Sequence, residues 1–408
     1  MIRIADRIKL LGTETAFAVS AEAAAWAAKG NKIYPFHLGD LNLATPQTVI
    51  EGSIKAIREG KTSYCPPAGI PKLREIMAAD INTARGTDYT MENVAIQPGG
   101  KPVITKFFQA LMNPGDQVLY PNPGYPIYES QIDFYGGVGV PYSYEEGKEN
   151  YILDLKAIEK KITPRTKIFV LNNLHNPTGA ECSEEEHKAI AEMAIKHNLI
   201  VLSDEAYFDM RYEGKSQSIA SLPGMKERTV ILYTFSKKFA MTGWRLGAAI
   251  GPKEIIDVIA KLNVNNESCS NHFIQYGAIE GMTSTSKEEK KLLDILKKRR
   301  DMAVDILNSI PGIRCYRPHA TFYLYPNVTE AMKKHGYDNY ETFRKDVLHH
   351  TGVSFCTRQH FGKMLPGEKE FYIRLAYSGI EEKDLKEGLE KFKKFMTTEK
   401  VKSKSAVI

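Results

Sequence analysis

Three apolar runs near the middle of the chain each end in polar residues of the kinds that carry out chemistry. The runs span residues 168–171, 199–202 and 229–233. The polar residues are Asn176 after the first run, Asp204 and Tyr207 after the second, and Thr234, Ser236 and Lys237 after the third. In a parallel sheet the carboxyl ends of the strands lie on one edge, which is where ligands bind in open α/β folds. We therefore expect an amide, a carboxylate, a phenol, two hydroxyls and a lysine to converge there.

The apolar runs also indicate the fold. These three runs and a fourth at residues 246–250 are apolar throughout, without the alternation of a half-exposed strand. Strands of this kind are covered on both faces, as in a parallel sheet. Residues 183–197 have the spacing of a helix between the first two runs, which is a βαβ arrangement. The pattern predicts an α/β fold.

Helices are predicted near the N-terminus as well. One begins with Ser20 as its cap and closes at Gly30, and a second is opened by Thr45 and Pro46 and ended by Gly60. A third stretch, residues 102–111, follows a pair of glycines. Its N-terminus would favour an anion.

The sequence pattern changes beyond about residue 285, where helices are more charged and buried apolar runs are fewer. The expected elements there are a charged helix at 287–307, short strands near 313–316, 322–325 and 371–375, and a last helix at 381–396. Strands and helices with fewer buried runs are typical of a smaller α+β domain. We place the boundary within the long helix, near residues 290–300.

Composition limits the function further. The 408 residues are 43% hydrophobic, which provides a full core and excludes a disordered or collagen-like chain. The net charge is +6, and the 55 basic and 49 acidic residues are interspersed, so we expect no nucleic-acid partner. Part of the excess comes from Lys400, Lys402 and Lys404, which predict a solvated tail.

The cysteines and the apolar runs predict where the protein works. Five scattered cysteines form no CxxC pair, so neither a disulfide framework nor a metal site is indicated. The first residues lack the long apolar run of a signal peptide. No stretch approaches the ~20 apolar residues that span a bilayer. We expect a cytoplasmic protein with no membrane contact.

Residues 236–247 resemble the cofactor-lysine signature of the class I aminotransferases, which are pyridoxal-phosphate enzymes of fold type I. The resemblance covers nearly the whole chain. Further matches are a segment that reaches across a dimer (64–74), a phosphate-cradling turn (99–101), a loop with an aromatic ring that stacks on the cofactor (123–128), and a strand with a carboxylate-binding arginine (373–377). The resemblance implies a large domain at 47–294 with a mostly parallel seven-stranded sheet, and a small domain from residues 1–46 and 295–408.

The resemblance also implies roles for single residues around pyridoxal 5′-phosphate. Lys237 would form the Schiff base and move a proton, Asp204 would keep the ring nitrogen protonated, and Asn176 and Tyr207 would bind the phenolic oxygen. The phosphate would be held by Gly99, Gly100, Lys101, Thr234, Ser236 and Arg245, with Tyr64 from the other subunit of a homodimer. Tyr125 would stack on the ring. For the substrate, Arg374 would bind the α-carboxylate, with the Gly39 backbone at the pocket mouth and Asn176 beside it.

Lys237 and Lys238 adjoin, so the reactive lysine must be chosen between them. The family places it eight residues before the phosphate-binding arginine, and counting back from Arg245 gives Lys237. Adjacent side chains point in different directions, so only one can reach the cofactor. The role of Lys238 stays open.

We therefore predict an aminotransferase that works by ping-pong chemistry on an L-amino acid and a 2-oxo acid. Aspartate and 2-oxoglutarate are the favoured pair, because Lys101 matches a position that lies near the distal carboxylate in some aspartate-acting relatives. An aromatic or alanine-type donor is the alternative, since Tyr64, Tyr125 and Phe17 could make the pocket apolar. A β-lyase, synthase or decarboxylase on the same scaffold and a non-enzymatic regulator also stay open. A nucleotide-dependent oxidoreductase is disfavoured because no GxGxxG follows a strand.

Overall fold

The computed structural model describes residues 2–12, 15–284 and 286–398. The predicted lysine tail at residues 400–404 lies outside them. At the centre is a seven-stranded sheet of order β2-β10-β9-β8-β7-β3-β4. Its strands are β2 (Val94–Gln97), β3 (Gln117–Pro121), β4 (Val138–Tyr142), β7 (Thr166–Leu171), β8 (Ile200–Asp204), β9 (Thr229–Thr234) and β10 (Gly247–Ile250). Six strands run in one direction and β10 runs in the other, so the prediction of a mostly parallel α/β sheet is confirmed.

The direction of β10 corrects one expectation, because residues 246–250 were expected to join the sheet in parallel. The chain between β9 and β10 forms only the short α8 (Phe235–Lys238) and η4 (Thr242–Trp244). These turn the chain back at the same edge of the sheet instead of crossing its face. Both faces of β10 are still covered, so its apolar run looks the same as that of a parallel strand.

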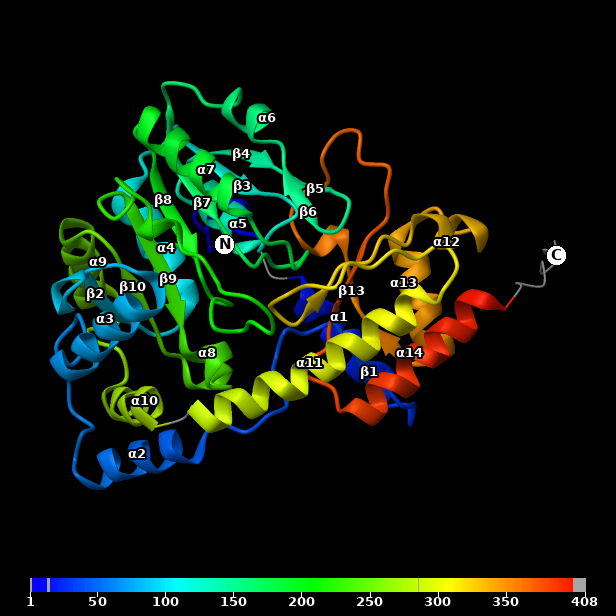
Figure 1. Ribbon diagram of the computed structural model, residues 1–408, viewed down its shortest axis with the longest axis horizontal. Helices are drawn as coiled ribbons and strands as arrows, with labels where there is room; N and C mark the ends of the chain where they lie inside the picture. Colours follow the sequence, from blue (N-terminus) through cyan, green and yellow to red (C-terminus); the bar gives the residue numbers. More distant parts are fainter. Residues whose placement is uncertain (1, 13–14, 285, 399–408) are drawn as a thin grey trace.

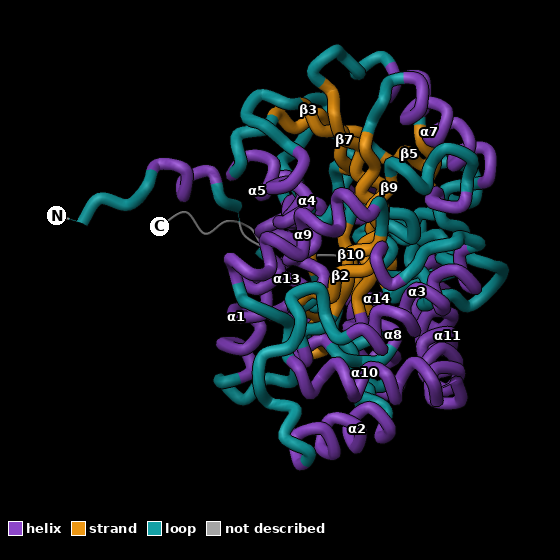
Figure 2. Tube along the Cα trace, turned by 90° about the vertical axis from the view of Figure 1, so that its left-hand side faces the viewer, coloured by secondary structure: helices purple, strands orange, loops and turns teal. Residues whose placement is uncertain are grey.

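Helices cover both faces of the sheet, which is why its strands are apolar throughout. Along β9, Val230 and Leu232 pack on one face and Ile231 and Tyr233 on the other. One face carries α4 (Gly100–Leu111), α5 (Ile127–Phe134) and α9 (Lys253–Asn266). The other carries α3 (Pro71–Arg85), α7 (Glu184–Lys196) and α10 (His272–Ser284), with α2 (Gln47–Arg58) packed on α10. The strands thus form a layer between helices (Figure 2).

One predicted helix is confirmed and has a capped start, and two other predicted starts need correction. The predicted helix at 183–197 is α7, which Ser183 caps through a reciprocal pair of hydrogen bonds with Glu186. The helix assigned to start at Ser20 is α1 (Ala16–Ala27), so Ser20 lies inside it. Thr45 does not cap α2, because its hydroxyl donates to the Ala240 carbonyl oxygen at 2.8 Å. In both cases the polar side chain near the helix start has no capping role.

The second part of the molecule combines the two ends of the chain. Figure 1 shows β1 (Tyr34–Pro35) and α1, in blue, among the orange and red C-terminal elements. β1 pairs in parallel with β12 (Val353–Ser354), and β11 (Tyr323–Leu324), β14 (Ile373–Ala376) and β13 (Cys356–Thr357) form a three-stranded sheet. The helices here are α11 (Ser286–Asn308), α12 (Thr329–Lys334), α13 (Tyr340–Thr351) and α14 (Glu382–Thr397).

The strand expected at 313–316 does not form. Arg314 makes only an isolated bridge with Asn327. The predicted boundary near residues 290–300 falls inside α11, which is one continuous helix there. The division at 46/47 and 294/295 stays a prediction.

The remaining elements are short. They are the strand pair β5 (Tyr144–Glu146) and β6 (Tyr151–Leu153), the helix α6 (Leu155–Glu159), and the single turns η1 (Asp6–Leu10), η2 (Met91–Asn93), η3 (Ile219–Ser221) and η5 (Arg358–His360). The segment that contains η1 projects from the body (Figure 2). Within the part of the chain that the structure describes, no helix has the length and apolar character to cross a membrane.

Candidate active site

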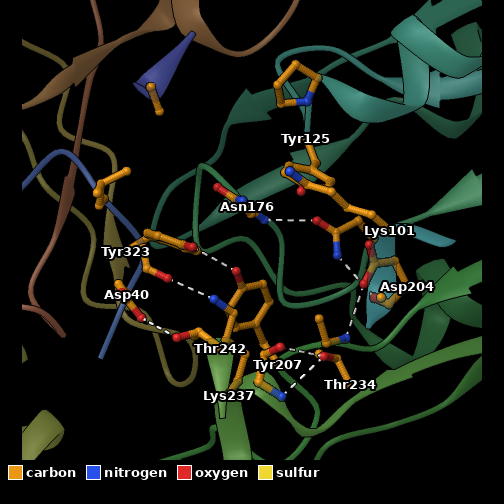
Figure 3. Close-up of a pocket in the computed structure, with 18 of the residues that line it drawn as sticks. Asp40, Lys101, Tyr125, Asn176, Asp204, Tyr207, Thr234, Lys237, Thr242 and Tyr323 are labelled. Carbon is orange, nitrogen blue, oxygen red and sulfur yellow. Dashed lines mark hydrogen bonds between the residues drawn. The ribbon is translucent and has the colours of Figure 1, made fainter. Parts of the chain in front are cut away.

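A cavity of about 510 Å³ lies at the edge of the large sheet where β7, β8 and β9 end. The residues predicted from the strand ends line it together: Asn176, Asp204, Tyr207, Thr234, Ser236 and Lys237. Figure 3 shows several of these side chains around the cavity. The parallel order of the three strands therefore brings residues from distant parts of the sequence to one place, as expected.

Asp204 is a buried carboxylate at the end of β8, only 5% exposed. Burial raises its pKa to about 6, although a hydrogen bond from Tyr128 favours the charged form. Tyr128 comes from α5, one turn after the loop that carries Tyr125, and donates its hydroxyl to Oδ2 of Asp204. The carboxylate is thus held in one orientation at the floor of the cavity.

Asn172 ties the first two strand ends to each other. Its Nδ2 donates to the Asp204 carbonyl oxygen at 3.1 Å, and its Oδ1 accepts from the backbone N–H of Asn176 at 3.0 Å. The side-chain Oδ1 of Asn176 is buried and has no hydrogen-bond partner within the described residues. A buried acceptor left without a partner is costly, so this oxygen can accept a hydrogen bond from a donor on a bound molecule.

The two adjacent lysines point to different places. Lys237 lines the cavity, and its Nζ donates to the Gly39 carbonyl oxygen at 2.8 Å. The Nζ of Lys238 lies 3.8 Å from Oδ1 of Asp209, and Lys238 does not line the cavity. The geometry favours Lys237 as the lysine that faces a ligand.

Glycine at position 39 allows a close approach by an aromatic side chain. A Cβ there would lie 2.0 Å from the hydroxyl oxygen of Tyr323. That hydroxyl shares a 2.7 Å hydrogen bond with the hydroxyl of Tyr207 (Figure 3). Gly39 is therefore required for the paired tyrosines to reach the cavity.

One side of the cavity is built to hold an anion. Gly99 has φ +105°, and a Cβ on it would lie 2.1 Å from a guanidinium nitrogen of Arg245. Directly after it, Gly100 and Lys101 form the first turn of α4, whose free N–H groups and dipole favour negative charge. The hydroxyls of Thr234 and Ser236 lie 2.9 Å apart on the same side. This set of donors matches the predicted phosphate site.

Arg374 of β14 brings another cation to the cavity. Its guanidinium is buried, donates to the His37 carbonyl oxygen, and lies 4.6 Å from the ring centre of Tyr323 and 5.0 Å from that of Phe361. Its Nε has no partner within the described chain. Burial, and then the charge of Arg374, lower the pKa of the His37 imidazole to about 4. The positive charge available to a ligand here therefore belongs to Arg374.

The predicted aromatic residues divide into two groups. Tyr125 lines the cavity, with its ring 5.8 Å from that of Tyr128, and Phe17 of α1 also lines it and is 59% exposed. Tyr64 does not line the cavity and is 84% exposed in the single chain. All the predicted site residues except Tyr64 and Gly99 therefore line the cavity of one chain, and Gly99 contacts the Arg245 guanidinium.

Several cavity residues escaped the sequence analysis. They are Asp40, Asn172, Thr242, Tyr323, His360 and Phe361, together with Tyr128 behind Asp204. Asn172 directly follows the apolar run at 168–171, and Tyr128 belongs to the segment 123–128 that resembles the cofactor-stacking loop. Their polar side chains, close in sequence to Asn176 and Tyr125, were the signal that could have identified them. Tyr323, His360 and Phe361 come from the C-terminal part, where no local pattern marked them. Within the described residues, no cluster of histidines, cysteines or carboxylates could hold a metal ion.

Comparison with known proteins gives one consistent answer. Residues 32–392 match the family described as aminotransferase class I and II. The probable aspartate/prephenate aminotransferase of Aquifex aeolicus is 35% identical over 397 residues, 96% of this chain and 98% of that protein. Aspartate aminotransferase from Thermus thermophilus, solved with maleate, has a TM-score of 0.88 at 29% identity and covers 97% of this chain and 100% of its own. Alanine aminotransferase from Pyrococcus furiosus has a TM-score of 0.88 at 31% identity, covering 97% and 99%.

The fold and the cavity are therefore those of a transaminase. The chain belongs to the family of class I and II aminotransferases. It is an enzyme that transfers an amino group from an amino acid to a 2-oxo acid.

The raised pKa of Asp204 predicts opposite effects of Asp204→Asn on stability and on activity. The folded pKa of about 6 exceeds the ordinary 3.8, so ionised Asp204 destabilises the fold above about pH 6 and has no such effect below about pH 4. Without cofactor, Asp204→Asn should gain about 2 to 3 kcal/mol in unfolding free energy at pH 8, and the gain should shrink toward pH 4. Amino transfer should fall by about a hundredfold or more.

Urea unfolding of wild type and variant at several pH values measures the first effect, and a coupled assay measures the second. Asn keeps an oxygen that can accept from Tyr128, so packing is preserved. A gain in unfolding free energy that does not depend on pH would contradict the raised pKa of Asp204. Near-normal turnover would contradict its assignment to the ring nitrogen of the cofactor.

Proposed function

We propose that the protein binds pyridoxal 5′-phosphate on Lys237 and transfers the amino group of an acidic L-amino acid, aspartate or glutamate, to a 2-oxo acid. The observation that carries this proposal is that Lys237, Asp204, Arg245 and Arg374 all line one cavity. Their types match the aldehyde, ring nitrogen and phosphate of the cofactor and the carboxylate of a substrate.

The residues present fit this cofactor. The backbone at Gly99 and the Arg245 guanidinium approach so closely that no side chain could stand between them, so this cation lies beside the start of α4, whose free N–H groups favour phosphate. Asp204 offers a negative charge in a buried position, where a ring N–H would relieve its desolvation. Asn176 lines the cavity, where the N–H groups of its side-chain amide can donate to a phenolic oxygen. When bound, the cofactor supplies an electron sink for the bond electrons at the α-carbon of the amino acid.

Lys237 is placed to move the proton in this reaction. Its Nζ lies 2.8 Å from the Gly39 carbonyl oxygen and 5.9 Å from the ring centre of Tyr207, so it stands between the substrate side and the strand-end residues. In the neutral form, Nζ can accept the proton from the α-carbon of the donor and pass it on within the same half-reaction, and in the other half it would return a proton to the α-carbon of the acceptor. The hydroxyl pair of Tyr207 and Tyr323 lies close by and offers a polar contact.

Arg374 orients the substrate. A guanidinium can bind a carboxylate through two parallel hydrogen bonds, and that of Arg374 is fixed by two aromatic rings and by the His37 carbonyl oxygen. A substrate held there at its α-carboxylate has little freedom to turn, which favours the orientation in which its α C–H bond is broken. Donor and acceptor share this one cavity, so they must use it in turn, which is the ping-pong order.

The acidic substrate class is supported by Lys101. This residue lines the cavity, and its Nζ lies 5.8 Å from the ring centre of Phe17 at the entrance. A second cation, apart from Arg374, suits the distal carboxylate of aspartate or glutamate. Relatives named for aspartate support the same class. An aromatic or alanine donor is the second candidate, because Phe17, Tyr125 and Phe361 also line the cavity and one similar structure is an alanine aminotransferase.

We further propose a homodimer with shared active sites. Tyr64 is 84% exposed in one chain, although its segment matches the family segment that reaches the phosphate of the other subunit. The segment itself is held firmly: Asn263 Nδ2 donates to the Pro67 carbonyl oxygen at 2.7 Å. A fixed segment with an exposed tyrosine fits a contact with a second chain. The cytoplasmic location stays a prediction of the sequence.

Substitution of each lysine tests the choice of Lys237. Lys237→Ala should abolish the absorbance band of the lysine-bound cofactor and lower amino transfer by about 10⁴-fold or more. Lys238→Ala should keep the band, because its ammonium faces Asp209. Spectra of both purified variants with added pyridoxal 5′-phosphate provide the measurement. The opposite pattern would show that the assignment is wrong by one residue.

Lys101→Met tests the acidic substrate class. The variant should lose roughly 10- to 100-fold in kcat/KM for aspartate, while kcat/KM for alanine stays nearly unchanged, because only aspartate has a distal carboxylate. The backbone N–H of residue 101 at the start of α4 is retained, so cofactor binding should persist. Equal losses for both donors, or equal wild-type rates for alanine, phenylalanine and aspartate, would remove the case for an acid-specific enzyme.

Mixing two defective homodimers tests the shared site. Tyr64→Phe should weaken binding of pyridoxal 5′-phosphate about tenfold, so at limiting cofactor it should keep only about a tenth of wild-type activity, while Lys237→Ala is inactive. After subunit exchange the heterodimer holds one site with both defects and one with neither. An equal mixture should then recover about a quarter of wild-type activity. No recovery after verified exchange, or a fully active monomer, would contradict shared sites.

A further inference from the structure

Arg85, the last residue of α3, lies behind the turn that carries Asp204 and Tyr207. Its side chain is 0% exposed and that of Glu205 is 3% exposed. The Nε of Arg85 donates to Oε2 of Glu205 at 2.6 Å. Neither Arg85 nor Glu205 lines the active-site cavity; Arg85 instead borders a separate cavity of about 260 Å³.

The same guanidinium also contacts a second residue of the turn. The Cζ of Arg85 lies 3.7 Å from the ring centre of Phe208, which is a stacking distance. Glu205 directly follows Asp204 in the chain, and Phe208 directly follows Tyr207. One cation therefore holds the two neighbours of the cavity residues from the side that faces away from the cavity.

Glu205 is fixed at both of its oxygens. Oε1 accepts from the hydroxyl of Ser203 at 3.0 Å and from that of Ser218, while Oε2 accepts from Arg85. Its backbone N–H donates to the Leu232 carbonyl oxygen of β9 at 3.2 Å. A shift of the Glu205 side chain would therefore disturb the end of β8, where Asp204 sits.

Stability alone does not explain why this buried ion pair is present. Both terminal nitrogens of Arg85 are buried without hydrogen-bond partners within the described residues, and an unmade bond to a buried charge is costly. Apolar side chains often replace a buried ion pair with no loss of stability. A role in placing the functional turn accounts for the pair better.

We propose that Arg85 is a positioning residue for Asp204 and Tyr207: it fixes their turn through Glu205 and Phe208 and offsets the negative charge of Glu205 behind Asp204. The inference rests on the proposed function, in which Asp204 and Tyr207 contact the cofactor. Charge matters as well as position, because Glu205 raises the pKa of Asp204, while burial is the largest cause of that rise.

The other ionisable groups near this pair come from several elements. Those that face Arg85 or Glu205 are His187 of α7, Tyr89, Tyr233 of β9 and Asp209, and Lys238 pairs with Asp209. Burial lowers the pKa of His187, so that imidazole is neutral near pH 7 and does not replace Arg85. Tyr128 and Lys237 are the ionisable groups that face Asp204 from α5 and α8.

The test compares Arg85→Met and Arg85→Lys with a matched change elsewhere. Arg300→Met is the control, because Arg300 is also buried, pairs with Glu213 and lies 5.0 Å from the ring centre of Tyr212. None of Arg300, Glu213 and Tyr212 lines the active-site cavity. The readouts are the affinity of the cofactor-free protein for pyridoxal 5′-phosphate, the pH midpoint of the bound cofactor's absorbance, kcat and KM, and urea unfolding.

Loss of the Arg85 charge leaves Glu205 uncompensated, which favours the protonated, more positive form of the bound cofactor. Arg85→Met should therefore raise the absorbance midpoint by about half a pH unit or more, and lower kcat about tenfold with a smaller change in KM. In Arg85→Lys the pH midpoint of the absorbance should lie closer to the wild-type value, because the positive charge is kept. Arg300→Met should lose stability and move neither quantity.

A folded Arg85→Met with wild-type midpoint and kcat would overturn the inference, as would an equal midpoint shift in Arg300→Met. Should Arg85→Met fail to fold, Phe208→Leu removes the stacking contact and keeps the ion pair; its kcat should fall, and an unchanged kcat would overturn the inference. Failure of the proposed function looks different, because the wild type itself would then bind no pyridoxal 5′-phosphate.

Discussion

The direction of the strands at one edge of the large sheet is the constraint on which the active site depends. β7, β8 and β9 run in parallel, so the residues that follow them meet at their carboxyl ends. β10 runs in the opposite direction, so its first residue lies at this same edge. Arg245, which precedes β10 in the chain, is therefore placed beside the ends of the other three strands. A reversal of any one of these strands would move its functional group to the opposite edge of the sheet.

This arrangement places charges where water is largely excluded. Asp204 and Arg374 are 5% and 3% exposed, and burying charged groups is unfavourable unless they are paired. The protein supplies only part of the pairing, through Tyr128 for the carboxylate and the His37 carbonyl oxygen for the guanidinium. The remaining hydrogen-bonding capacity fits a bound ligand. Local stability is thus exchanged for affinity, which is common at functional sites.

Much of the sheet and of the cavity could be predicted because their signals are local. The apolar runs of β7, β8 and β9 and the capped start of α7 are short, contiguous patterns. The direction of β10 could not be predicted, because burial on both faces gives the same apolar run in either direction. Ser20 and Thr45 misled the analysis for a related reason: a hydroxyl near a helix start has several possible partners, and only the packed structure selects one.

The sequence by itself determined the strand ends and the polar residues that follow them, because residues such as Asp204 and Lys237 stand shortly after buried runs, and the resemblance of its motifs indicated the family. Only the tertiary structure decided which groups surround them. Tyr323 meets Tyr207 across 116 residues, and Lys237 meets the Gly39 backbone across 198. Arg85 reaches Glu205 across 120. Such contacts follow from how helices and strands pack on one another, and side-chain packing between distant segments has no periodic pattern in the sequence.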